Sequence, residues 1–119
     1  MYRLLNKVLE DYKDLTFTFR YPINILIKDK TLLTEEERKY AYHHNTYVDF
    51  LIYNKISKIP LLAIEVDRYK YHKEDNKQKE RDILKNNILS KYNIPLIRLT
   101  TNGSREKDII INKLNNILN

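Results

Sequence analysis

The stretch Pro60-Leu61-Leu62-Ala63-Ile64-Glu65-Val66-Asp67 decides the fold. A continuous apolar run of this length, begun by a proline, predicts a strand that is covered on both faces. Residues two apart on a strand point to the same side, so Glu65 and Asp67 share a face. Burying two carboxylates is costly unless they are paired or bind a cation. The stretch therefore predicts a buried strand with a polar site at its end.

A third acid lies on the strand that is predicted just before this one, at residues 48–53. Residues 54–58 predict a turn between the two strands. Pairing centred near Ser57 sets Asp49 opposite Glu65, and opposed residues of an antiparallel pair project on one face. The three carboxylates would then converge, which calls for a metal ion or a raised pKa. The alternative is that acids at the strand ends simply face water.

The composition limits the class of protein. With 119 residues the chain has the size of one domain, and an apolar fraction of 42% is typical of a globular protein. The chain has no cysteine, which excludes disulfides and fits a reducing, cytoplasmic setting, and no apolar run approaches the length of a membrane span. A net charge of +6 favours polyanionic partners, although a Lys-, Asn- and Ile-rich composition can also follow from genome base composition.

The remaining patterns predict an alternation of helices and strands. Helices are predicted at residues 2–13, 34–42, 75–92 and 104–118. A capping box from Thr34 to Glu37 begins the second helix, and Ile109, Leu114 and Ile117 are predicted to face inward from the last. Strands are predicted at residues 15–21, 48–53, 60–67 and 94–99, and residues 23–33 are predicted as a loop. This order predicts a mixed α/β layer fold in a single domain, residues 1–119.

The long helix at 75–92 has a divided inner face. Its later turns present an apolar stripe that consists of Leu84, Ile88, Leu89 and Tyr92. Extending the stripe backwards brings in Gln78, Arg81 and Lys85, which are amide and cationic groups. Such groups are expected to face the sheet where carboxylates lie opposite them; otherwise the long side chains would snorkel to the rim.

These segments resemble the PD-(D/E)XK nuclease superfamily. Within it, the chain is similar to the small very-short-patch-repair-like endonuclease domain found at the C-terminus of some bacterial helicases. The motifs that carry the resemblance are Val48-Asp49-Phe50, Ile64-Glu65-Val66-Asp67, His72, Gln78, Arg81-Asp82 and Ile94-Pro95-Leu96-Ile97-Arg98. The resemblance is close over residues 46–100 and covers the rest in outline. It implies a restriction-endonuclease-like mixed sheet of about four strands, flanked by helices.

The resemblance also implies an activity, that of a magnesium-dependent DNA endonuclease. Asp49, Glu65 and Asp67 would hold Mg²⁺, with Mn²⁺ as a substitute, and the ion would activate water and polarise the phosphoryl oxygen. Catalytic roles would fall on the same three acids and on His72, Gln78 and Arg81. The domain would be a phosphodiesterase module of a helicase or DNA-repair system, with the helicase domain in the same or a partner chain.

Lysines near the carboxylate strand are the predicted DNA contacts, namely Lys70, Lys73, Lys77 and Lys85. The alternative is a solvated charged face. Arg68 stands where the resembling subgroup often has glycine, which is expected to reshape the loop beside the site. Two other classes of function stay open, a catalytically inactive nuclease-like DNA-binding module and a helicase-docking module.

Overall fold

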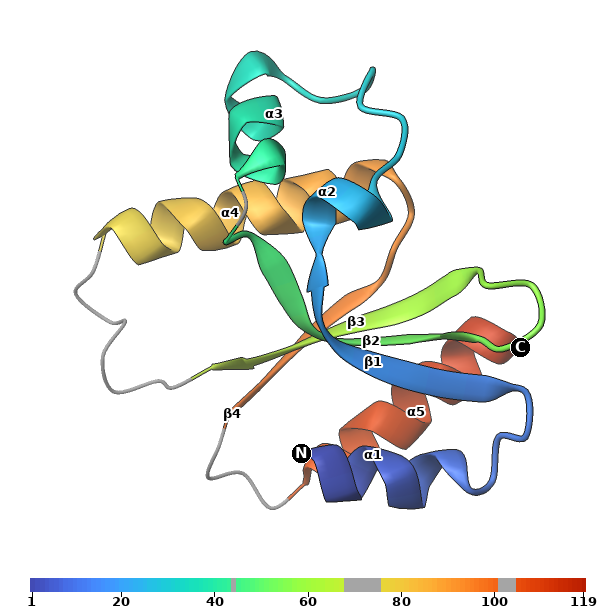
Figure 1. Ribbon diagram of the computed structural model, residues 1–119. Helices are drawn as coiled ribbons and strands as arrows, with labels where there is room; N and C mark the ends of the chain where they lie inside the picture. Colours follow the sequence, from blue (N-terminus) through green and yellow to red (C-terminus); the bar gives the residue numbers. More distant parts are fainter. Residues whose placement is uncertain (44, 68–75, 101–104) are drawn as a thin grey trace.

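Four strands form one mixed sheet in the computed structural model, which describes residues 1–43, 45–67, 76–100 and 105–119 (Figure 1). The strands are β1 (Leu15–Pro22), β2 (Tyr47–Asn54), β3 (Pro60–Asp67) and β4 (Leu96–Thr100). They lie in the order β1-β2-β3-β4, with antiparallel pairing from β1 to β3 and parallel pairing of β3 with β4. The predicted α/β fold with a mixed four-stranded sheet is confirmed.

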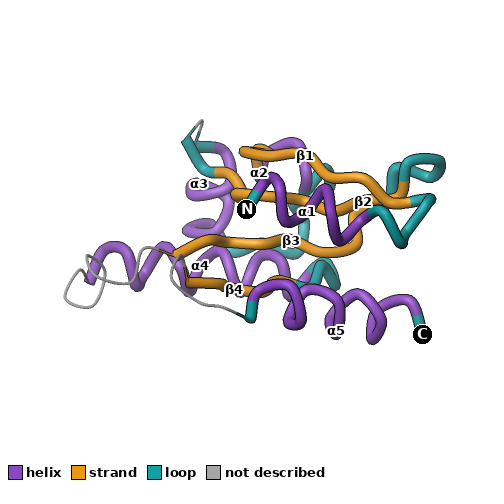
Figure 2. The backbone as a smooth tube through the Cα atoms, turned by 90° about the horizontal axis from the view of Figure 1, so that it is seen from below, coloured by secondary structure: helices purple, strands orange, loops and turns teal. Residues whose placement is uncertain are grey.

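Helices cover both faces of this sheet (Figures 1 and 2). One face carries α1 (Tyr2–Leu9) and α5 (Glu106–Leu118), and the other carries α2 (Ile23–Leu26), α3 (Glu35–Tyr42) and α4 (Asn76–Lys91). Parallel neighbours require a crossover connection, and α4 lies in the connection between β3 and β4. None of the helices in the described ranges has the length and apolar character needed to cross a membrane.

Alternate residues of β3 fill two different cores. Leu62 and Ile64 are fully buried in a cluster with Ile110 of α5. Ala63 is fully buried on the opposite side, in a cluster with Ile88 of α4. The prediction that this strand is covered on both faces is therefore confirmed. Glu65 and Asp67 follow directly after these buried residues, at the end of the strand.

The N-terminal helix is shorter than predicted. It ends at Leu9, and the chain then turns so that the hydroxyl of Tyr12 donates a hydrogen bond to Oδ1 of Asn115 in α5 (2.8 Å). The predicted loop at residues 23–33 was also wrong in part, because it contains α2. A helix of four residues is too short to show a helical period in the sequence.

The inward face of α5 differs from the predicted one at its first residue, Ile109. Ile110 and Leu114 are fully buried, whereas Ile109 is 45% exposed. Neighbouring residues on a helix are separated by about 100°, so Ile109, one residue before Ile110, points away from the core, whereas Leu114 faces inward as predicted. Ile117 is partly buried against the same core, as predicted.

The predicted capping box of α3 is confirmed and also fixes the helix against α4. The backbone N–H of Thr34 donates to the carboxylate of Glu37 (2.9 Å), and the N–H of Glu37 donates to the Thr34 hydroxyl (3.1 Å). Glu37 is also ion-paired with Lys91 at the end of α4. These contacts hold α3 beside α4, where the two helices form one side of a cleft. The predicted turn at residues 102–104 lies outside the described residues.

Candidate functional site

The regular ladder between β2 and β3 ends at Phe50 and Ile64, and two carboxylates continue the contact beyond it. The same register sets Asp49 opposite Glu65, as the turn centred near Ser57 predicts. The backbone N–H of Asp49 donates to Oε2 of Glu65 (2.8 Å), and the N–H of Val66 donates to Oδ2 of Asp49 (2.8 Å). The two carboxylates thus replace backbone carbonyls as acceptors, which fixes their positions between the strand ends.

Glu65 is buried and paired with a lysine from α4. Only 5% of the residue is exposed, and Lys85 forms an ion pair with Oε1 while its ammonium also donates to the backbone carbonyl of Tyr47 (2.8 Å). Burial raises the pKa of the Glu65 carboxyl above its usual value; the Lys85 ammonium opposes that rise, and the charge of Asp49 adds to it. The ionised form of Glu65 therefore depends on a nearby cation.

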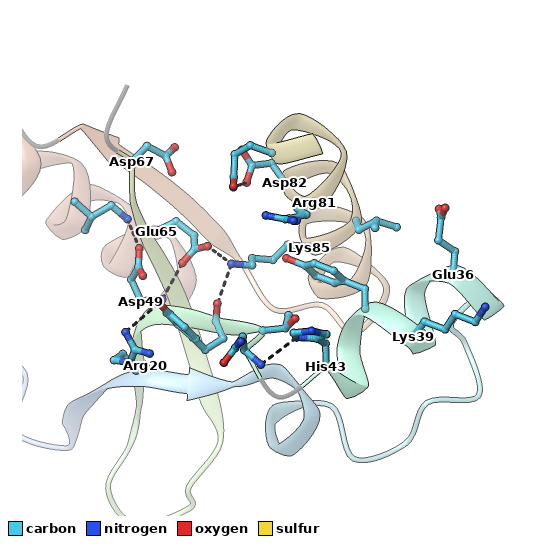
Figure 3. Close-up of a pocket in the computed structure, with 17 residues that line it drawn as sticks. Arg20, Glu36, Lys39, His43, Asp49, Glu65, Asp67, Arg81, Asp82 and Lys85 are labelled. Carbon is cyan, nitrogen blue, oxygen red and sulfur yellow. Dashed lines mark hydrogen bonds and ion pairs between the residues drawn. The ribbon is translucent and has the colours of Figure 1, made fainter. Parts of the chain in front are cut away.

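A cleft of about 1080 Å³ opens in front of these carboxylates (Figure 3). The sheet side of the cleft carries Asp49, Glu65 and Asp67, and the α4 side carries Gln78, Arg81 and Lys85. In Figure 3 the Lys85 side chain extends from α4 towards Glu65. The predicted inward placement of the amide and cationic groups of α4 is confirmed, and they face the acids.

Asp67 shares this face but has a different partner from Glu65. A guanidinium nitrogen of Arg98, on β4, lies 3.3 Å from Oδ1 of Asp67 and 3.5 Å from Oδ1 of Asp82. The side-chain amide of Gln78 donates to the same oxygen of Asp82 (3.0 Å). Asp67 and Gln78 thus belong to a network that ties β3 and β4 to α4.

All three predicted ligands are carboxylates, and two of them, Asp49 and Glu65, are held next to each other. Asp49 and Glu65 supply the oxygen donors that Mg²⁺ prefers, and this ion commonly keeps several waters as its other ligands. Among the described residues, no group of three or more aspartate, glutamate or histidine side chains has the arrangement of a metal site. The structure brings Asp49 and Glu65 together through hydrogen bonds, and it pairs Asp67, which lines the same cleft, with Arg98.

The predicted lysine contacts are only partly within the described residues. His72, Lys70, Lys73 and the substituted position Arg68 lie outside them. Lys77 is exposed in the first turn of α4 and does not line the cleft, whereas Lys85 does.

Tyr40 of α3 lines the cleft and was not predicted from the sequence. Burial raises the pKa of its hydroxyl to about 12, and the negative charges of Glu65 and Asp82 add to the rise. The phenol is therefore neutral near pH 7. The sequence gives little indication that Tyr40 belongs to the site. Tyr40 is one of ten tyrosines, and no pattern in the sequence places α3 next to the strands that carry the acids.

Arg20 and Tyr47 form a second unpredicted part of the site. The Arg20 guanidinium lies 4.2 Å from the centre of the Tyr47 ring and donates to the Tyr47 hydroxyl (3.0 Å). Tyr47 lies two residues before Asp49, so its place on the acid-bearing face was readable from strand alternation. Arg20 gave no such signal, because its position depends on how β1 pairs with β2.

The fold and the site define an α/β protein with a buried carboxylate–lysine pair at the end of its central strands. The chain belongs to the family described as protein of unknown function (DUF2726), whose model matches residues 1–117. No curated protein and no solved structure matches the chain.

Proposed function

We propose that this chain is a magnesium-dependent DNA endonuclease domain with a restriction-endonuclease-like fold of the PD-(D/E)XK type. The observation that carries the proposal is the pair of carboxylates, Asp49 and Glu65, that face a cationic helix across an open cleft. The motifs around these acids in the sequence support the same assignment. The reaction would be the hydrolysis of a phosphodiester bond.

The residues of the cleft would have different roles in this reaction. Asp49 and Glu65 would hold Mg²⁺ or Mn²⁺, and a bound ion supplies Lewis-acid polarisation of the phosphoryl oxygen. Lys85 presents an ammonium beside Glu65, where positive charge stabilises the charge that develops on a phosphate. Tyr40 stays protonated because its pKa is about 12, so its role would be hydrogen-bond donation and not proton abstraction.

Arg81 is a second candidate for phosphate contact. It lies one helical turn before Lys85 on the side of α4 that lines the cleft. Its guanidinium has no hydrogen bond or ion pair with any of the residues that the structure describes, in contrast to Arg98. A guanidinium fork of this kind suits a phosphate oxygen pair.

The proposal extends to the cellular setting. The chain would act in the cytoplasm, as its lack of cysteine suggests, and its net charge of +6 fits a polyanionic partner. The sequence motifs favour a module that works with a helicase or a DNA-repair system, with the helicase domain in the same chain or in another.

Arg81→Ala is expected to slow DNA cleavage by about tenfold or more, because a cation that faces the reacting phosphate is lost. The assay follows nicking of supercoiled plasmid and cutting of single-stranded circles with Mg²⁺, with Mn²⁺ and with a chelator. Wild-type protein should cut only with an ion present. Lys79→Ala is the matched control, because Lys79 is exposed on the same helix and lies outside the cleft. Equal rates for the two variants would remove Arg81 from the site.

A DNA-binding module without turnover is the second candidate function. The ion pairs favour it, since Lys85 already neutralises Glu65 and Arg98 already neutralises Asp67. This candidate predicts a protein that binds DNA in chelator and cuts it with neither ion. A helicase-docking module, in contrast, predicts weak DNA binding that Arg81→Ala does not change.

A further inference from the structure

We propose that a groove beside the cleft binds one unpaired nucleobase, so that the substrate is single-stranded next to the reacting phosphate. The inference rests on the proposed function only in taking nucleic acid as the partner. It concerns a surface on the α1 side of β1 and β2, where Tyr2, Phe19 and Arg20, which belong to none of the sequence motifs, lie beside Asp49 and Phe50.

The groove is continuous with the cleft. Its volume is about 290 Å³, and its lining residues are Tyr2, Phe19, Arg20, Asp49 and Phe50. Arg20 and Asp49 line the cleft as well, and both lie on its sheet side in Figure 3. A ligand that reaches the carboxylates therefore has a path along Arg20 into the groove.

The groove presents aromatic rings to solvent. Phe19 is 58% exposed and Tyr2 is 57% exposed. Beneath them, the ring of Phe17 lies 5.2 Å from that of Tyr2, edge to face, and 6.1 Å from that of Phe50. The rings of Tyr2, Phe17 and Phe50 pack on one another at an angle, and Phe19 is paired with Phe50 across the two strands, so apolar ring surface is exposed at the groove. Such a surface suits a nucleobase, because every base has a π face that stacks on an aromatic side chain.

Arg20 sets a cation at the boundary between the groove and the cleft. Its φ is 52°, a left-handed value that is unfavourable for a residue other than glycine. Regular pairs flank it, with Phe19 beside Phe50 and Tyr21 beside Val48, so only Arg20 departs from strand geometry. The departure aims the guanidinium over Tyr47, whose backbone carbonyl also accepts from Lys85.

The order of groups along this path matches a nucleotide. The carboxylates come first, then the Arg20 cation, then the exposed rings, which corresponds to a reacting phosphate, a second phosphate and a base. An apolar side chain of a protein would also cover the rings. It would leave the Arg20 guanidinium without an anionic group, however, so the cation at the rim of the groove favours the nucleotide.

The test measures binding and does not depend on hydrolysis. Fluorescence anisotropy with labelled single-stranded and duplex oligonucleotides of one sequence is recorded in chelator. Phe19→Leu, which keeps an apolar side chain and removes the π face, should weaken single-strand binding by about fivefold or more and leave duplex binding unchanged. Phe19→Tyr should bind as the wild type does. Tyr42→Leu is the control, because Tyr42 is also 58% exposed and lines neither the groove nor the cleft.

Three results would overturn the inference. They are wild-type single-strand affinity for Phe19→Leu, an equal loss for single strands and duplexes, and no binding of nucleic acid by the wild type. The two proposals fail separately. A selective loss in Phe19→Leu without cleavage by the wild type would refute the nuclease and keep the groove. Cleavage by the wild type together with normal single-strand binding by Phe19→Leu would refute the groove and keep the nuclease.

Discussion

Asp49→Asn is expected to reduce DNA cleavage by about a hundredfold or more while the protein stays folded. Asparagine keeps a carbonyl oxygen that can accept the bond from the N–H of Val66, so the strand ends stay in contact. It lacks the negative charge that would hold a divalent ion beside Glu65. The measurements are the rate of plasmid nicking at saturating Mg²⁺ and the thermal unfolding curve of the metal-free protein.

Asp11→Asn is the matched control for this prediction. Asp11 is an exposed acid that follows α1 and does not line the cleft, and its replacement changes the net charge by the same amount. It should cleave as the wild type does. A wild-type rate for Asp49→Asn would contradict the role of Asp49 as a ligand, and an equal loss in both variants would point to a non-specific effect of charge.

Lys85→Met is expected to lower the free energy of unfolding by about 3–5 kcal/mol, because it leaves a buried carboxylate without its partner. The side chains of Lys85 and Glu65 are only 12% and 7% exposed, so water gives the pair little screening. Methionine has a similar length and fills the same space. Urea unfolding measures the loss, and Lys79→Met, on the exposed side of α4, should change the free energy of unfolding by no more than about 0.5 kcal/mol.

The Lys85→Met defect should depend on pH with a definite sign. Without the ammonium, the pKa of Glu65 in the folded protein rises further above the usual 4.5. A carboxyl whose pKa is higher in the folded state binds more protons when folded, so stability is lost as the pH rises through the folded pKa. The defect should therefore be largest near neutral pH and shrink as the pH falls towards 4.5. Adding Glu65→Gln to Lys85→Met should remove most of the pH dependence; a defect that is constant with pH would contradict this account.

The part of the site that the sequence predicted depends on local geometry. A short turn joins β2 to β3, so the position of Ser57 sets the register, and strand alternation then sets the faces of Glu65 and Asp67. The inward side of α4 followed from the helical period in the same way. The facing of carboxylates and cations required no knowledge of how the rest of the chain packs.

The other parts depend on contacts between segments that no short turn connects. β1 pairs with β2 across residues 23–46, which contain α2 and α3, so no local pattern placed Arg20 in the same cleft as Asp49. The ion pair of Asp67 with Arg98 could not be predicted for a related reason. The crossover through α4 brings β4 beside β3 but does not fix which residues meet, and the register that sets Glu65 beside Arg98 was not readable in advance.

The backbone N–H groups of Asp49 and Val66 donate to carboxylates and not to backbone carbonyls, and each can therefore serve as a spectroscopic probe. Amide proton resonances respond to the charge of the group that accepts the hydrogen bond. The resonance of the Asp49 amide therefore follows the state of Glu65, and that of the Val66 amide follows the state of Asp49. A nuclear magnetic resonance titration of uniformly labelled protein would thus observe the arrival of a cation at each carboxylate separately. No label inside the cleft is needed, because each acid is read through the main chain of a residue on the facing strand.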